Sequence, residues 1–191
     1  MDRREALSRV GLLLGGTVIG GNLFLQGCTS GPGSVSTVED LFKPEHVAFL
    51  NEVAETILPA TKTPGAKEAK VGEFMGVMVR DCYTADDQKT FVEGLKKLEE
   101  ASKKKNSKSF MESTPEQRTA LLTDLDKEQK EYQKSKKDDQ PNHYFRMIKE
   151  LTLLGFFTSE PGATKALRYV AVPGKYDGNL PYKKGDRAWA T

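Results

Sequence analysis

The clearest hydrophobic pattern in the chain follows Pro44, a residue that suits the first position of a helix. Apolar side chains then recur at steps of three and four residues, which places them on one face of an α-helix. They are Val47, Leu50, Val53, Ala54, Ile57 and Leu58. Pro59 cannot continue a helix. The pattern therefore predicts an amphipathic helix that starts at Pro44 and stops before Pro59.

Two further helices are predicted between residues 71 and 105, and Thr84 can cap the second of them. The apolar face of the first consists of Val71, Phe74, Met75, Met78, Val79 and Cys82. The face of the second consists of Phe91, Leu95 and Leu98. We expect Cys82 to be a small buried apolar residue.

The run Thr114-Pro115-Glu116-Gln117 is typical of a helix start, because Thr can cap, Pro fits the first helical position and Gln can complete a capping box. The helix that follows begins with leucines and then turns very polar, so its second half is expected to project into solvent. A last helix is predicted to start at Asp139-Gln140-Pro141. It is apolar nearly all round by Phe157, which predicts a place at the centre of the core.

No segment alternates apolar and polar residues with the period of two that a half-buried strand requires. The sequence therefore predicts an all-α fold, a single helical bundle of about five helices with an irregular aromatic C-terminal tail. The predicted boundaries are an export signal over residues 1–27, a lipid-tethered linker over 28–40, the helical domain over 41–171 and the extended tail over 172–191.

Proline and glycine interrupt the chain from residue 172 onward and disfavour both helix and sheet. The tail nevertheless contains Tyr176, Tyr182 and Trp189, the single tryptophan of the chain. Disordered segments are usually poor in aromatic residues, so this tail is expected to dock on a surface. That surface is either its own domain or a partner, since Trp and Tyr are enriched at interfaces. The sequence leaves both choices open.

The N-terminal segment has the features of an export signal that ends at Cys28. The run Leu25-Gln26-Gly27-Cys28 places a small residue before the cleavage position and a thiol after it that can carry a lipid. Arg3 and Arg4 resemble a twin-arginine pair, although Ala6 stands where that motif usually has Phe. Five glycines between residues 11 and 21 keep the apolar run weakly hydrophobic, which suits the twin-arginine route.

We therefore expect export, removal of residues 1–27, and a mature protein held on the periplasmic side of a membrane by acyl chains on Cys28. The alternative is a retained membrane anchor. The apolar run over residues 10–25 is shorter than the ~20 residues that a membrane span needs, which favours the cleaved signal.

Charge and composition exclude several classes of function. The net charge of +2 falls to +1 without the signal, so the chain offers no field that would attract nucleic acid. With Cys28 acylated, Cys82 is the only thiol left, and no disulfide within the chain is expected. His46 and His143 lack the spacing of metal ligands. No catalytic residue and no metal site are therefore predicted.

Two blocks of the sequence carry a resemblance to a known family. The first is Phe49-Leu50-Asn51-Glu52-Val53-Ala54-Glu55-Thr56-Ile57-Leu58-Pro59, with Pro64-Gly65-Ala66 after it. The second is the stretch over residues 151–162, followed by Val172-Pro173-Gly174-Lys175-Tyr176. Both resemble the gluconate 2-dehydrogenase subunit 3 family, the small gamma subunit of membrane-associated flavin dehydrogenases that act on sugars. Glu160-Pro161-Gly162-Ala163 departs from the family's form, in which Asp-Pro precedes a Gly-Gly-Asn run.

The resemblance implies a subunit that binds no cofactor itself and pairs with a large flavin-binding oxidoreductase of the glucose–methanol–choline type. FAD is expected in that partner, and a haem c subunit often accompanies it. The resemblance also implies that the small subunit stabilises its partner and brings it through twin-arginine export. This chain looks like the lipoprotein variant of the family.

We expect the interface with the flavoprotein to combine the end of the last helix with the tail. The predicted residues are Phe156, Phe157, Glu160, Pro161, Gly162, Pro173, Gly174, Tyr176, Tyr182 and Trp189. A competing hypothesis is a stand-alone periplasmic lipoprotein with a carbohydrate-binding or structural role, in which the tail aromatics stack on a sugar ring. An independent enzyme has the least support.

Overall fold

The structure, a computed structural model, describes residues 35–138, 140–172, 174–175 and 177–190. The predicted export signal with Arg3 and Arg4, and the lipidation site Cys28, lie outside the described residues. Pro173 and Tyr176, two of the predicted interface residues, also lie outside them.

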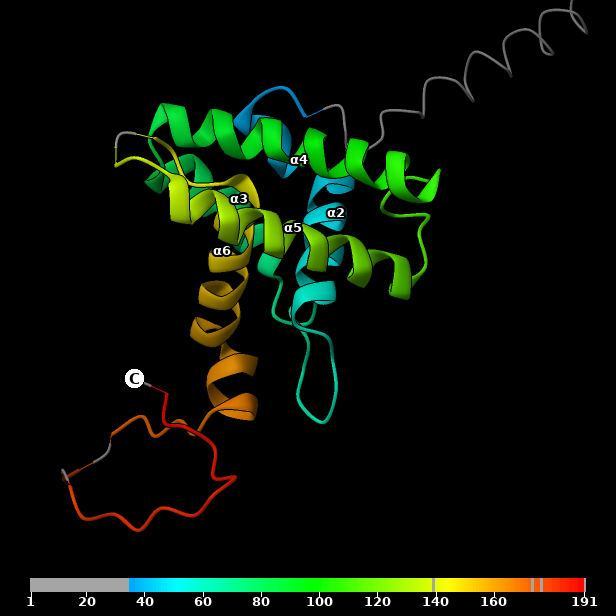
Figure 1. Cartoon of the computed structure of the whole chain (residues 1–191). Coiled ribbons are helices and arrows are strands. Elements are labelled where there is room, and N and C mark those ends of the chain that lie inside the picture. Colours follow the sequence, from blue (N-terminus) through cyan, green and yellow to red (C-terminus); the bar gives the residue numbers. More distant parts are fainter. Residues whose placement is uncertain (1–34, 139, 173, 176, 191) are drawn as a thin grey trace, which may run out of the picture.

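The described chain is helical, and within residues 35–190 its one pairing of β type is an isolated bridge between Arg168 and Trp189. Five long helices form the bundle in Figure 1. The elements are η2 (Val38–Phe42), α2 (Pro44–Ile57), α3 (Val71–Cys82), α4 (Ala85–Asn106), α5 (Pro115–Ser135), α6 (Tyr144–Thr158) and η3 (Gly162–Ala166). The prediction of an all-α bundle with about five main helices is confirmed.

Local signals account for where most of the helices start. Pro44 is the first residue of α2, and the Thr84 hydroxyl caps α4 by accepting a hydrogen bond from the Asp87 amide. The predicted capping box of α5 is present, because Thr114 and Gln117 exchange hydrogen bonds of 3.0 and 3.3 Å between backbone and side chain. Such a cap stabilises a helix by about 1 kcal/mol.

The start of α6 differs from the prediction, because the helix begins at Tyr144 and not at residues 139–141. The preceding residues are bound to the end of α5 instead. The Tyr132 hydroxyl donates to the Pro141 carbonyl at 3.0 Å, and the Gln133 amide donates to the Asn142 side chain at 3.2 Å. His143 becomes the cap, since its Nδ1 accepts a hydrogen bond from the Phe145 amide at 3.2 Å.

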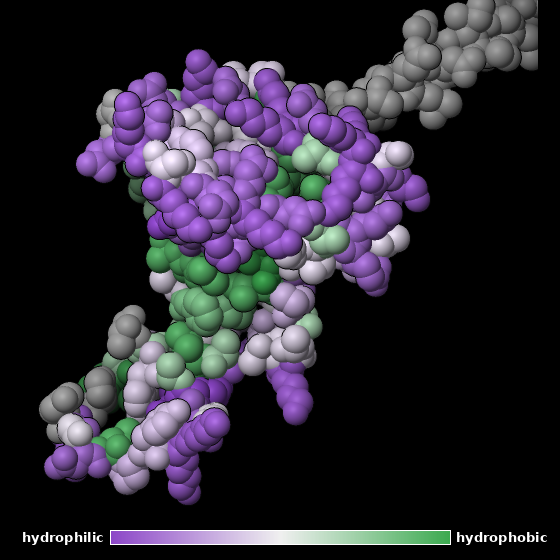
Figure 2. All heavy atoms as spheres, viewed as in Figure 1, coloured by the Kyte–Doolittle hydropathy of each residue, from purple (hydrophilic) through white to green (hydrophobic). Residues whose placement is uncertain are grey.

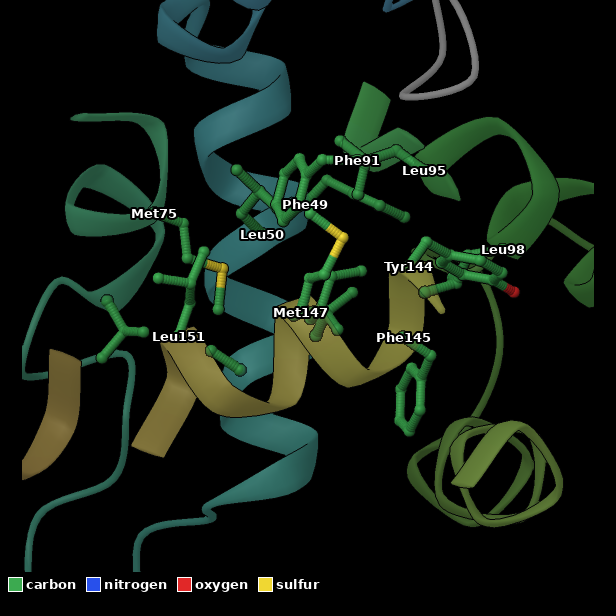
Figure 3. Close-up of a cluster of buried hydrophobic side chains, with 14 of the residues drawn as sticks. Phe49, Leu50, Met75, Phe91, Leu95, Leu98, Tyr144, Phe145, Met147 and Leu151 are labelled. Atoms are coloured by element: carbon green, nitrogen blue, oxygen red, sulfur yellow. The ribbon is translucent and has the colours of Figure 1, made fainter. Parts of the chain in front are cut away.

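Helix α6 lies at the centre of the core, as predicted, and packs against all four other long helices. Figure 3 shows side chains of α2, α3, α4 and α6 meeting in one cluster. Its fully or almost fully buried members include Phe49, Leu50, Met75, Phe91, Leu95, Leu98, Phe145, Met147 and Leu151. Each buried side chain of this size contributes roughly 1.5–3 kcal/mol relative to an exposed one.

Helices α2 and α3 approach each other closely at Gly72. The Gly72 amide donates to the side-chain oxygen of Asn51 at 2.8 Å, and the Asn51 amide nitrogen donates to Glu73 at 3.0 Å. A Cβ atom at position 72 would lie 2.8 Å from the backbone nitrogen of Asn51 and 2.8 Å from the carbonyl oxygen of Val47. Only glycine therefore allows this contact, which fixes α3 against α2.

Three other expectations differ from the structure. The second half of α5 packs on the bundle and does not project into solvent: Gln129 is buried, and Lys149 of α6 donates to Asp126 at 2.6 Å. Cys82 is exposed at the end of α3, because the buried face of that helix turns away after Val79. The packed region also begins before residue 41, since Val35 is fully buried.

We expect the His143 cap to make stability depend on pH. Burial lowers the pKa of His143, and the nearby Glu128 only partly opposes this shift. The unfolded chain therefore binds more protons below pH ~6.5, so the free energy of unfolding falls as pH decreases through that range. A His143→Asn variant keeps a capping oxygen that does not titrate.

The measurement is thermal unfolding of the wild type and His143→Asn between pH 7.5 and 5.5. The variant should be less stable at pH 7.5, because it loses the ring contacts of His143 with Tyr132 and Tyr144, but it should lose less further stability on acidification. Parallel curves for the two proteins would show that the His143 cap does not control this pH dependence.

Candidate partner-binding surface

The C-terminal half of α6 extends beyond the bundle, as Figure 1 shows, and carries η3 and the tail at its end. The N-terminal half of the same helix supplies Tyr144, Phe145 and Ile148 to the core. One helix therefore joins the rigid centre of the domain to a projecting arm. We call this arm, residues 153–172 and 174–190 where described, the C-terminal arm.

An apolar stripe runs along the exposed side of the arm's helix. Leu153, Leu154 and Phe157 are exposed and lie on one side of α6 at helical spacing. The residues on the other side of the helix are buried. Figure 2 shows hydrophobic atoms gathered below the hydrophilic surface of the bundle, where the chain narrows toward the tail. Exposed apolar surface of this kind is typical of a protein-binding site.

Two residues predicted for the interface face the interior instead. Phe156 is only 4% exposed, and its ring packs edge-on against that of Phe157 at 5.1 Å between centroids. Gly162 is also buried, and a Cβ atom there would lie 1.8 Å from the carbonyl oxygen of Phe156. These two residues shape the turn after α6, and Phe157 and Glu160 are the members of this block that solvent reaches most.

The turn after α6 is held by its own hydrogen bonds. The Ser159 hydroxyl donates to the Phe156 carbonyl at 2.6 Å and accepts from the Gly162 amide at 3.1 Å. The Leu167 amide then donates to the Gly162 carbonyl at 2.9 Å and closes η3. Glu160-Pro161-Gly162 therefore lies in a closed turn.

The end of the tail returns to the arm through a group of contacts that we call the clasp, made by Lys165, Arg168, Arg187, Ala188, Trp189 and Ala190. Arg168 donates its amide to the Ala188 carbonyl and accepts from the Ala190 amide, both at 2.8 Å. Its guanidinium lies 4.3 Å from the centre of the Trp189 ring. Arg187 donates to the Lys165 carbonyl at 2.7 Å.

Of the tail aromatics, Trp189 thus packs on its own chain, whereas Tyr182 is largely exposed to solvent. Trp189 stacks on Arg168 and remains 46% exposed, whereas Tyr182 is 76% exposed. Gly174 is exposed at a positive φ of 75°. Docking on the chain itself and presentation of the tail to solvent therefore occur together.

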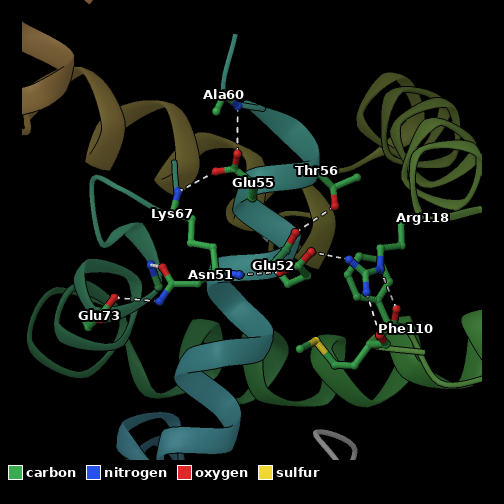
Figure 4. A network of polar contacts seen from close by, with 11 residues as sticks. Asn51, Glu52, Glu55, Thr56, Ala60, Lys67, Glu73, Phe110 and Arg118 are labelled. Carbon is green, nitrogen blue, oxygen red and sulfur yellow. Dashed lines mark hydrogen bonds and ion pairs between the residues drawn. The ribbon is translucent and has the colours of Figure 1, made fainter. Parts of the chain in front are cut away.

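The loop between α2 and α3 is held in place by carboxylates of α2 (Figure 4). Glu55 accepts from the amides of Ala60 and Lys67, both at 2.8 Å. The side chain of Lys165 in η3 donates to Glu68 in this loop at 2.8 Å. The loop therefore ties the base of the C-terminal arm to α2.

Glu52 on α2 is the centre of a neighbouring network that also appears in Figure 4. Arg118 of α5 pairs with Glu52 and donates to the carbonyls of Phe110 at 2.9 Å and Met111 at 2.6 Å. Burial alone would raise the pKa of Glu52, but the hydrogen bond from Lys67 and the charge of Arg118 lower it overall. The network joins α2, α5 and the loop that precedes α5.

A groove of about 290 Å³ lies between α2, α5 and α6 and is open to solvent. Its lining consists of Thr56, Ile57, Thr119, Leu122, Thr123, Asp126, Phe145 and Lys149. Tyr182 and Trp189, which the sugar-binding hypothesis invoked, are not part of it. In the part of the chain that the structure describes, no group of three or more His, Cys, Asp or Glu side chains is placed to hold a metal ion.

None of the helices from α2 onward is long and apolar enough to cross a membrane.

The sequence did not predict the role of Arg168, which organises the tail, or the exposure of Leu153 and Leu154. The leucines could have been found from the same apolar run that predicted a central helix. A helix that is apolar all round but leaves the bundle must expose part of that surface.

Comparison with known proteins gives one match. The model of the family described as gluconate 2-dehydrogenase subunit 3 matches residues 44–174, which is more than half of the chain. This range covers α2 to α6, η3 and the first part of the tail. No curated protein and no solved structure matches the chain.

Proposed function

Because the chain belongs to the gluconate 2-dehydrogenase subunit 3 family, we propose that it is a non-catalytic small subunit that binds and stabilises the large flavoprotein of a membrane-associated sugar dehydrogenase. The observation that carries the proposal is the extent of the match, which includes both the bundle and the turn after α6. The chain is a subunit by family, so a partner oxidoreductase is the natural occupant of its exposed surface.

The geometry supports a binding role through the C-terminal arm. Leu153, Leu154 and Phe157 lie on a helix whose other half is locked in the core, so the stripe is presented with little freedom to move. A rigid apolar surface loses little conformational entropy when it binds. Large side chains at the centre of such an interface carry most of the binding free energy. FAD is assigned to the partner, and a haem c subunit is a further candidate member of the complex.

The export part of the proposal rests on the sequence. Arg3 and Arg4 would direct a folded complex to the twin-arginine route, and this subunit would escort a partner that has no signal of its own. Acyl chains on Cys28 would then hold the complex on the periplasmic side of a membrane.

The test is co-expression of the tagged chain with the oxidoreductase subunit, followed by purification from the membrane fraction. We expect a complex with flavin absorbance and an acylated N-terminus at Cys28 by intact mass. Replacing Arg3 and Arg4 together by Lys keeps the charge but removes the guanidinium pair, so export of both proteins should stop. Cys28→Ala should leave the complex intact but release it from the membrane or leave it unprocessed.

Three results would contradict parts of the proposal separately. A tagged chain that purifies alone would exclude the subunit role. Normal export of the double Lys variant would exclude the twin-arginine escort. A free N-terminus at another residue would exclude lipidation.

A further inference from the structure

The clasp closes residues 169–187 into one loop, which we call the C-terminal loop. Its two ends meet where Arg168 exchanges backbone hydrogen bonds with Ala188 and Ala190. The ring of Trp189 covers the guanidinium of Arg168 at 4.3 Å, which is within the distance of a favourable cation–π contact. The loop is therefore joined at its base by the clasp.

Turns inside the loop restrict it further. The Asp177 side chain accepts from the Asn179 amide at 3.1 Å. The Asp186 side chain accepts from the Lys183 amide at 3.1 Å, while the Asp186 amide donates to the Lys183 carbonyl at 3.0 Å. Gly185 takes a positive φ of 97° within that turn, which disfavours any other residue there.

The described surface of the loop is both apolar and basic. Val172 is 81% exposed, and Leu180 and Tyr182 are exposed with it. Residues 168–190 contain five Lys and Arg but two Asp, a net charge of +3, whereas the whole chain carries +2. The rest of the chain therefore carries a net charge of −1, and the positive charge lies beside the most exposed apolar side chains of the described residues.

We propose that the clasp preforms the C-terminal loop to dock on an apolar surface with an acidic rim on the oxidoreductase subunit. This inference rests on the proposed function. It adds two features to that function: the clasp, which fixes the shape of the binding loop, and the acidic character of the surface that the loop binds. An open loop would lose conformational freedom on docking, and a loop already closed by the clasp loses less. The lysines would speed association with an acidic rim and make binding weaken with salt.

The experiment uses the full chain and the co-purified oxidoreductase subunit. Arg168→Ala removes the stack on Trp189, the only tryptophan, so acrylamide quenching of its fluorescence should increase. The dissociation constant for the oxidoreductase should rise about tenfold in Arg168→Ala and in Trp189→Ala. Thermal unfolding of the bundle should stay unchanged, because the clasp lies outside it.

Arg80→Ala is a matched control, since Arg80 also stacks on an aromatic ring, that of Phe42 at 4.6 Å, but on the bundle. It removes the same charge and should change neither quenching nor affinity. Replacing Lys183 and Lys184 together by Glu should leave quenching as in the wild type, weaken binding at low salt and reduce its salt dependence. Comparison of the double lysine variant with Arg168→Ala distinguishes the effect of the loop's charge on binding from the effect of its closure by the clasp.

Each part of the proposal can be overturned. Increased quenching in Arg168→Ala with unchanged affinity would exclude preformation, and unchanged quenching would exclude the clasp itself. A wild-type chain that does not bind the oxidoreductase would instead exclude the proposed function. Binding of the Cys28→Ala chain to anionic phospholipid vesicles through Lys183 and Lys184 would assign the loop to a lipid surface. A loop-dependent dimer in sedimentation equilibrium would assign it to a second copy.

Discussion

Replacing Arg118 by Ala should lower the free energy of unfolding by about 3 kcal/mol, the largest loss expected from a single side chain outside the apolar core. The Arg118 side chain is 13% exposed and that of Glu52 is 21% exposed, so water replaces the lost hydrogen bonds poorly. The substitution leaves the carbonyls of Phe110 and Met111 and the Glu52 carboxylate without their shared donor. At ~3 °C per kcal/mol, the melting temperature should fall by about 10 °C.

Two variants make this result specific to the geometry of Arg118. Lys67→Ala removes the other cation of Glu52, but Lys67 is largely exposed, and the loss should stay below ~1 kcal/mol. Arg118→Lys keeps the charge, but lysine cannot reach three acceptors that lie in different directions. The stability of this variant should therefore lie between those of Arg118→Ala and Lys67→Ala. Equal losses in Arg118→Ala and Lys67→Ala, measured by urea unfolding, would show that the carbonyl contacts contribute nothing.

Deleting residues 172–191 should weaken binding of the oxidoreductase subunit by more than thirtyfold, with the bundle still folded. Thirtyfold corresponds to about 2 kcal/mol, the effect of losing one central anchor, and the deletion removes Tyr182, Trp189 and the clasp together. Among the described residues, the last that packs against the apolar core is Ala166, so the melting temperature should remain within a few degrees of the wild type. The measurements are circular dichroism melting and titration of the oxidoreductase.

The point variant Tyr182→Ala is the companion to this deletion. Tyr182 has no hydrogen bond or ring contact with the described chain that would couple it to stability, so its loss should affect binding alone. A truncated chain that melts much earlier would place the tail in the domain's own core. A truncated chain that binds with unchanged affinity would leave the interface to Leu153, Leu154 and Phe157.

Much of the fold followed from local signals in the sequence. Pro44, Thr84 and Thr114 start helices because each satisfies or removes a free amide at the first turn, an effect that depends on neighbouring residues only. The start of α6 could not be found this way, since Tyr132 and Gln133 of α5 hold the residues before it. The burial of Gln129 likewise follows from the packing of α5 against other helices, which no local signal shows.

The candidate site was predicted less completely than the fold. The sequence indicated where the surface lies, at the end of the last helix and in the tail, because aromatic residues accumulate there without a regular element to bury them. It could not distinguish Phe156 from Phe157, which are adjacent and in ring contact but differ in exposure, because Phe156 is buried and Phe157 is exposed. It gave no sign that Arg168 meets Trp189, since a contact across 21 positions of irregular chain has no periodic signature.

Helix α6 belongs to the core at one end and to the binding surface at the other, and this has a consequence for hydrogen exchange. Amides near Ile148 can open only when the bundle unfolds, whereas those near Phe157 need only the end of the helix to fray. Exchange rates should therefore rise steeply along one continuous helix in the isolated subunit. A partner bound to the arm would remove that gradient, and through linkage it would slow global unfolding of the whole domain as well.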